Sequence, residues 1–150
     1  MFTQIKEGKP AMTAEAVKTI DNVVLDKDIF VYQNVSQFLL KLSHMDVIVM
    51  EAALPSGRTF LARNEYDFLF LNSQCDAHSV TGEFQPAFLK RALDRILDHG
   101  TSLLRARKML LAGGVKHVAV NLKEMKCRLI SNDCKRFFNY DIISREWTVE

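Results

Sequence analysis

Apolar residues at helical spacing predict two helices in the first third of the chain. Thr13 can cap a short helix that ends near Asn22. A second helix is predicted from Val35 to about His44, because Asn34 followed by Gln37 resembles a capping box. The buried face of this second helix would consist of Phe38, Leu39, Leu42 and Met45.

The pattern then changes to that of β-strands. Residues 46–54 are rich in Val, Ile and Met, and Pro55-Ser56-Gly57 supplies turn residues before a returning strand over 59–63. The next segment, 66–71, is apolar on both faces, which is typical of a central, covered strand. We therefore expect a three-stranded antiparallel meander that lies under helices on at least one face.

A long helical stripe follows from Ala87 to Ala112, with Pro86 in its first turn. Gly100 interrupts the stripe. The triplet His99-Gly100-Thr101 is compatible with a close-packing point within one long helix or with a C-cap followed by a new N-cap. We favour the break, which gives a helical hairpin or a kinked pair, and Gly113-Gly114 then ends the second helix.

Three further strands are predicted over residues 115–122, 126–131 and 137–149. Strands therefore cluster in runs, without βαβ alternation, which indicates an α+β fold. The expected architecture is an antiparallel sheet of two three-stranded meanders covered by helices, in a two-layer sandwich. In element order alone, and without a shared motif, the region from Val35 to Ile130 resembles the small secretion chaperones of type III systems.

Length and composition make a single globular domain the expected organisation of residues 1–150. A chain of this length can bury about two thirds of its unfolded surface, and 48% hydrophobic with 25% charged residues is ordinary for a globular protein. Neither a secretory signal nor a membrane-spanning run is recognisable. Three cysteines, an odd number, fit a reducing compartment, so we expect a cytoplasmic protein.

Charge divides the chain into two halves. Residues 1–83 contain 7 Lys and Arg against 11 Asp and Glu, whereas residues 84–150 contain 13 against 7. Several of the later cations could converge on one face that binds phosphates or an acidic protein, or they could simply keep an outer helix face solvated. The candidate binding residues are Lys90, Arg91, Arg95, Arg105, Arg107, Lys108, Lys135 and Arg136.

Side chains that could bind a metal or catalyse a reaction are few. Cys75 and His78 have a spacing that lets both reach one zinc ion, and a hairpin could add Cys127 and Cys134. The alternative is that these cysteines act as small apolar residues. Glu51 and Asp67 each interrupt an apolar strand, where burial could raise a pKa enough for general acid catalysis. The alternatives are an edge of the sheet that faces solvent, or pairing with Arg58 or Arg63. No catalytic residue is assigned, and no cofactor is expected.

These observations favour a small protein-interaction domain without catalysis, such as an adaptor, an inhibitor or a chaperone-like protein. An acidic half beside a basic half also favours self-association into a homo-oligomer. One alternative is the binding of nucleic acid or another anionic ligand through the basic half, and a second is a small oligomeric enzyme with an interface active site. We expect another protein as the partner, and no membrane.

Overall fold

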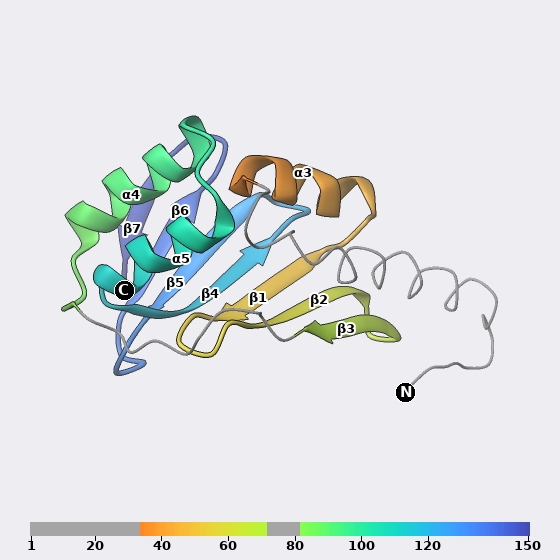
Figure 1. Ribbon diagram of the computed structural model, residues 1–150, viewed down its shortest axis with the longest axis horizontal. Helices are drawn as coiled ribbons and strands as arrows, with labels where there is room; N and C mark the ends of the chain where they lie inside the picture. The colour runs from red at the N-terminus through yellow and green to blue at the C-terminus, as the bar shows by residue number, and fades with distance from the viewer. Residues whose placement is uncertain (1–33, 72–81) are drawn as a thin grey trace.

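The computed structural model describes residues 34–71 and 82–150 (Figure 1). The predicted helix after Thr13 and the candidates Cys75 and His78 lie outside these ranges. The described helices are α3 (Val35–His44), α4 (Pro86–Asp98) and α5 (Leu103–Ala112), and the strands are β1 (Val49–Ala53), β2 (Arg58–Asn64), β3 (Asp67–Leu71), β4 (Val115–Asn121), β5 (Lys126–Ser131), β6 (Phe137–Asp141) and β7 (Trp147–Val149).

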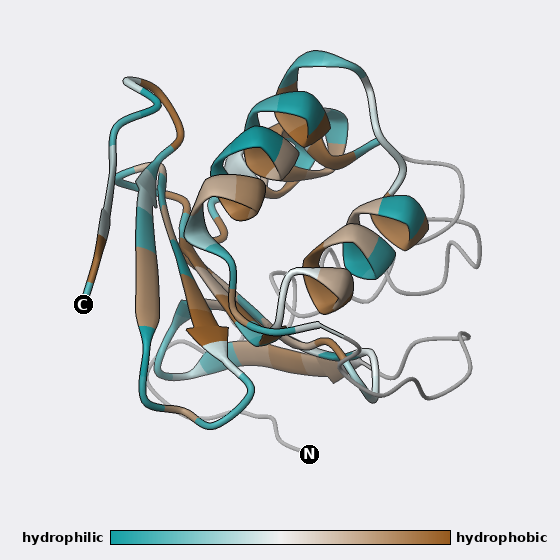
Figure 2. Ribbon diagram, turned by 90° about the vertical axis from the view of Figure 1, so that its left-hand side faces the viewer, coloured by the Kyte–Doolittle hydropathy of each residue, from teal (hydrophilic) through white to brown (hydrophobic). Residues whose placement is uncertain are grey.

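All seven strands form one antiparallel sheet with the order β3-β2-β1-β4-β5-β6-β7. The two runs of strands meet where β1 pairs with β4, with Met50 opposite Val120. The three described helices lie on one side of this sheet (Figures 1 and 2). The predicted α+β class with an antiparallel sheet is thus confirmed. None of the described helices is long and apolar enough to cross a membrane.

Local sequence signals fix the start of α3. The Asn34 side-chain oxygen accepts a hydrogen bond of 2.8 Å from the Gln37 backbone N–H, which satisfies a donor that the first helical turn leaves open. Three apolar side chains of the helix are buried against the sheet. They are Phe38, Leu39 and Leu42.

The helical stripe after Pro86 is broken, as the sequence favoured. Helix α4 ends at Asp98, Gly100 adopts a φ of +64°, and α5 begins at Leu103. Ser102 caps α5, because its hydroxyl oxygen accepts from the Arg105 backbone N–H. This α4–α5 elbow also contacts the start of α3, where the Val35 N–H donates to the Thr101 carbonyl at 2.8 Å.

Strand β3 is an edge strand within the described residues, so the prediction that it is central is wrong. Asp67 and Leu69 face the helices, whereas Phe68 and Phe70 face the other way. Phe70 is 72% exposed. The alternation of apolar residues is the same whether the second face is covered or open, which is why the sequence pattern was misleading.

The predicted strand over 137–149 is in fact a hairpin of β6 and β7, so the second run has four strands and not three. The Asp141 carboxylate accepts from the backbone N–H groups of Ile143 and Ser144, and Arg145 has a φ of +69°. Asp is a strong turn former because its side chain bonds the backbone just ahead of it, and this signal outweighs the surrounding apolar pattern.

The Gly113-Gly114 pair ends α5 as predicted and also permits a close backbone crossing. Gly114 has a φ of +86°, and a Cβ at this position would lie 2.4 Å from the Phe84 nitrogen. The Gly113 carbonyl accepts from the Gln85 N–H, and the Gly114 carbonyl accepts from the Asn132 N–H. The pair therefore joins the entry to α4, the end of α5 and the β5–β6 turn.

Candidate functional site

The face of the sheet that points away from the described helices carries an aromatic cluster formed by Phe60, Phe68 and Phe70. Their ring centroids lie 4.9 Å (Phe60–Phe70), 6.0 Å (Phe60–Phe68) and 6.1 Å (Phe68–Phe70) apart. Residues of the neighbouring register positions, such as Leu61 and Met50, are buried under the helices. We call this outward surface the open face, and Phe70 is its most exposed aromatic residue.

A polar pair lies next to the aromatic cluster on the open face. Glu51 occupies the register position between Phe60 and Ala119, and its Oε1 lies 3.3 Å from His117 Nε2. A shallow hollow lined in part by Phe60, Phe70, Glu51 and His117 connects the pair to the cluster. Glu51, one of the two carboxylates that stand out in the sequence, thus pairs with a histidine from β4.

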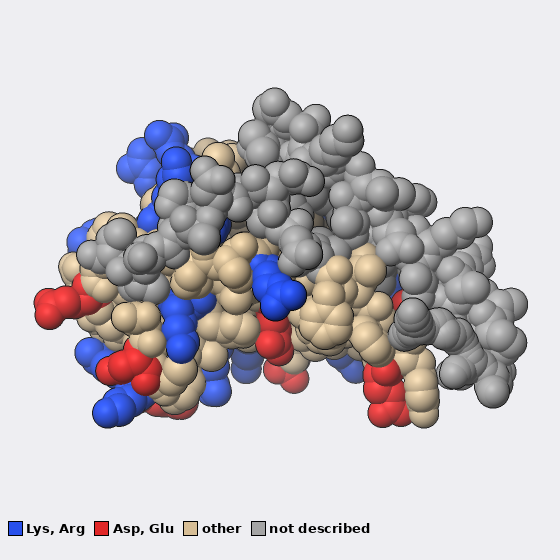
Figure 3. All heavy atoms as spheres, turned by 60° about the horizontal axis from the view of Figure 1, so that its bottom comes forward, with Lys and Arg blue, Asp and Glu red and all other residues tan. Residues whose placement is uncertain are grey.

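The β5–β7 end of the open face is polar. Arg128 Nε donates to Asn139 Oδ1 at 2.8 Å, and its guanidinium lies 5.2 Å from the Phe137 ring centre. Glu150 Oε1 lies 3.7 Å from Arg128 Nη2. Figure 3, which brings the underside of Figure 1 forward, shows acidic and basic side chains interspersed among uncharged ones over the described part. No extended area of one charge sign is visible there.

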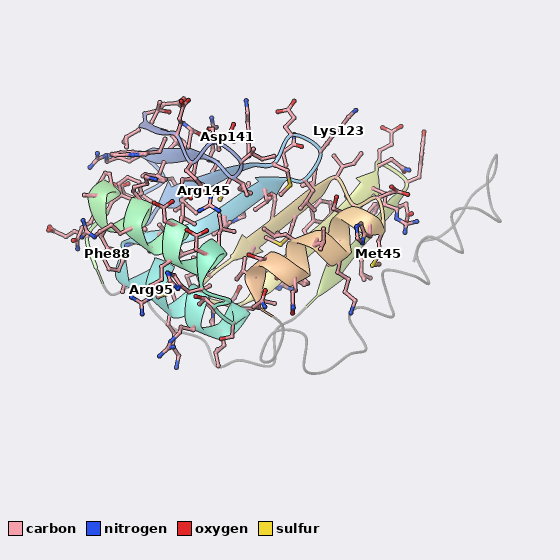
Figure 4. All side chains as sticks on the ribbon, turned by 90° about the horizontal axis from the view of Figure 1, so that it is seen from above. Met45, Phe88, Arg95, Lys123, Asp141 and Arg145 are labelled. Atoms are coloured by element: carbon pink, nitrogen blue, oxygen red, sulfur yellow. The ribbon has the colours of Figure 1, made fainter. Side chains whose placement is uncertain are left out.

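The eight predicted binding cations occupy different environments. On the helices, Lys90 Nζ forms an ion pair of 2.7 Å with Asp94. Arg95 lies on the side of α4 toward α5, and Arg145 lies on the opposite side (Figure 4). Arg136 lies in the β5–β6 turn next to the exposed Lys135, with its guanidinium 5.0 Å from the Phe84 ring centre. The exposed cations of α4 and α5 are Arg91, Arg95, Arg105 and Lys108.

Arg107 is an internal residue, in contrast to the expected surface position. Its side chain is only 8% exposed, and Nε donates to the Leu54 carbonyl at 2.6 Å while Nη2 donates to the Pro55 carbonyl at 2.9 Å. The guanidinium therefore attaches α5 to the β1–β2 turn. A rigid fork of donors suits this task, because two adjacent carbonyls can be bonded at once.

The described cysteines occupy unrelated environments. Cys127 is buried on the helix-facing side of β5, and burial raises the pKa of its thiol to about 12, so it remains protonated at neutral pH. Cys134 is exposed in the β5–β6 turn. Within residues 34–71 and 82–150, no group of three or more His, Cys, Asp or Glu side chains is arranged to hold a metal ion.

Asp67 is buried at the end of the sheet, as the interrupted strand pattern suggested. Burial raises the pKa of its carboxyl group, and the nearby charge of Arg63 opposes this effect only in part. The Arg63 Nη1 to Asp67 Oδ2 distance is 3.7 Å. The pairing of Asp67 with Arg63, which was one of the alternatives left open by the sequence, is thus confirmed.

A second charged group links α4 to the sheet. The Tyr140 hydroxyl on β6 donates to Asp94 Oδ1 at 2.5 Å, Lys90 donates to Oδ2, and Arg145 Nη2 donates to Asp98 at 2.9 Å. Burial works against ionisation of Asp94, but the hydrogen bonds from Lys90 and Tyr140 outweigh it and lower the pKa of Asp94. Burial and the same carboxylate raise the pKa of Tyr140, which keeps the phenol protonated.

Between the helix layer and the sheet lies an apolar cavity of about 130 Å³. All three described helices line it on one side, and β1, β2, β4, β5 and β6 line it on the other. Phe38, Ile96 and Leu110 close the helix side, and Met50 and Val118 close the sheet side.

Few side chains around this cavity are polar. Among the described lining residues, only Thr59, Arg107, Cys127 and Tyr140 carry side-chain N, O or SH groups. Tyr140 donates to Asp94, Arg107 to the β1–β2 turn, and Thr59 Oγ1 to the Gly57 carbonyl at 3.4 Å. The Cys127 thiol is neutral. The lining is thus mostly carbon, and Arg107 is its charged residue.

Three features were not anticipated from the sequence: the Glu51–His117 pair, the Asp94–Tyr140 group and the cavity. Each depends on residues from strands or helices that are far apart in the chain. The only sequence signal related to the cavity was the presence of two small residues, Ala52 and Ala106, among its lining positions.

Comparison with protein-family models finds no match, and comparison with curated proteins finds no relative.

Proposed function

We propose that this chain is a protein-interaction domain that binds through its open face and associates with a second copy of itself. The observation that carries this proposal is the aromatic cluster around Phe70, which is 72% exposed. Large aromatic side chains surrounded by polar residues are the usual anchors of protein–protein interfaces. A role as an adaptor, an inhibitor or a chaperone-like protein in the cytoplasm is compatible with such a surface.

Charge on the open face supports self-association. Glu51 lies near the aromatic cluster, and Arg128 lies two strands away on the same face. In a two-fold symmetric pair each surface contacts its own copy, so Glu51 of one copy can approach Arg128 of the other, twice per dimer. Interspersed charges of both signs fit a protein partner better than a polyanion, which selects surfaces of one sign.

Sedimentation velocity over a concentration series tests this proposal. Phe70→Asp places a charge in the centre of the cluster and should weaken the dimer by about 30-fold or more, the scale of an interface hot spot. Ile143→Asp is the matched control, because Ile143 is 75% exposed but lies in the β6–β7 turn. It should leave association unchanged.

Equal association of wild type and Phe70→Asp would refute a role for the open face. A wild type that is monomeric at every concentration would refute self-association. A photo-crosslinking residue at position 70, compared with one at 143, then tests for a different protein partner. Crosslinks at 143 and not at 70 would refute the open face as the interface for that partner too.

A further inference from the structure

We propose that the cavity between the helices and the sheet binds a small uncharged apolar molecule, about the size of one benzene ring or a short alkyl chain. The cavity lies under the helices, on the side of the sheet opposite the open face, so this activity is separate from partner binding. The proposal is carried by the size of the cavity and by its mostly apolar lining.

Size sets the ligand class. A cavity of about 150 Å³ lined by Leu, Ile and Phe remains dry and accepts benzene, and the cavity here has about 130 Å³. A water molecule needs two or more polar partners, and this lining is mostly apolar, with Thr59, Arg107 and Tyr140 donating to groups elsewhere in the protein. A cavity of this kind either holds an apolar molecule or stays empty.

Small side chains keep the space open. Ala52 on β1 and Ala106 on α5 both line the cavity and contribute only a methyl group each. Proteins rarely retain a void larger than a water molecule, because filling it gains contacts at no polar cost. The small residues at these two positions are accounted for if a bound molecule supplies the missing contacts.

The lining also excludes cationic ligands. An ammonium group placed among Phe38, Leu110 and Val118 would lose its hydration without gaining an acceptor. The Arg107 guanidinium, which also lines the cavity, would repel it. We therefore expect benzene to bind and benzylammonium, which has the same ring with a charged aminomethyl group, not to bind.

Thermal unfolding of the full chain with and without benzene tests the proposal. Benzene at ten times its dissociation constant should raise the midpoint of wild type by about 3–6 °C. Benzylammonium at the same concentration should leave the midpoint unchanged. Both measurements use the unaltered protein, so they do not depend on whether a variant folds.

Matched alanine substitutions locate the effect. Ala106→Leu fills the cavity, so it should raise the midpoint in the absence of benzene and abolish the benzene shift. Ala92→Leu is the control, because Ala92 is equally buried on a helix but does not line the cavity. Overpacking there should lower the midpoint and keep the benzene shift.

The exposed Ala112→Leu should change neither quantity. The proposal is overturned if wild type shows no benzene shift, if benzylammonium shifts the midpoint as benzene does, or if Ala106→Leu retains the shift. An Ala106→Leu midpoint that falls as far as that of Ala92→Leu would show that no space exists at Ala106, which also overturns it.

Discussion

Asp94 and Asp67 occupy environments that move their pKa values in opposite directions. Donors from Lys90 and Tyr140 overcome burial and lower the pKa of Asp94, so its contribution to stability is present above its unfolded pKa and is lost as the pH falls. Burial raises the pKa of Asp67, so the folded state holds its proton more tightly, and its contribution declines as the pH rises.

Tyr140→Phe isolates the hydrogen bond to Asp94 with little change of shape. We expect a loss of about 1.5 kcal/mol in the free energy of unfolding at pH 7, since the acceptor is ionised. The loss should be smaller at pH 3, because protonation of Asp94 removes the charged acceptor that strengthens this hydrogen bond. Urea unfolding at both pH values measures this, with the exposed Tyr66→Phe as a control of negligible effect. An equal loss at both pH values would contradict the assigned role of Asp94.

At the scale of single residues, the sequence predicted what local chemistry determines. The Asn34 cap, the first-turn Pro86 and the break at Gly100 are each set by neighbours along the chain. The inward direction of Arg107 was not predictable, because its partners are carbonyls of a turn more than fifty residues away. Lys and Arg have long stems that can place the charge on either side of a helix.

At the scale of elements, α5 and the β1–β2 turn depend on one another through Arg107. The buried guanidinium donates to the Leu54 and Pro55 carbonyls, and Gly57 closes the turn with an N–H bond of 2.7 Å to the Ala53 carbonyl. The turn was predictable from the residues Pro55-Ser56-Gly57. Its attachment to a helix was not predictable, because contacts between distant residues leave no pattern in the local sequence.

Arg107→Met tests this attachment while keeping most of the side-chain length. We expect a loss of about 3 kcal/mol in the free energy of unfolding, because two carbonyls lose charged donors. The amide of Gly57 should exchange its hydrogen faster. Arg105→Met on the exposed side of the same helix is the control and should change stability by less than about 0.5 kcal/mol. Similar losses in the two variants would show that Arg107 does not hold the turn.

The order of the strands in the sheet was also only partly predictable from the sequence. The hairpins β1–β2 and β4–β5 follow from short connections, but the pairing of β1 with β4, which joins the two runs into one sheet, spans the two helices between them. That pairing puts β3 at one edge and exposes its Phe face. A periodic pattern predicts which residues share a face of a strand, but it does not predict whether that face is covered by other elements.

At the scale of the whole molecule, the described helices and the open face differ in charge arrangement. Two of the six predicted binding cations on the described helices are not exposed. Lys90 is neutralised by Asp94 and Arg107 is internal, which leaves four exposed cations on α4 and α5. They are Arg91, Arg95, Arg105 and Lys108.

Nucleic-acid binding by these four cations should therefore be weak and steeply dependent on salt. Contact with about four phosphates predicts a loss of about 10²-fold in affinity between 50 and 200 mM salt. Fluorescence anisotropy with a labelled single-stranded oligonucleotide measures this. Changing all four cations to Glu should abolish the binding and leave self-association through Phe70 intact, since the helices and the open face lie on opposite sides of the sheet. The contrary outcome is tight binding that persists at 200 mM salt and that Phe70→Asp abolishes together with self-association. That result would assign nucleic-acid binding to the open face, where the aromatic cluster could stack bases.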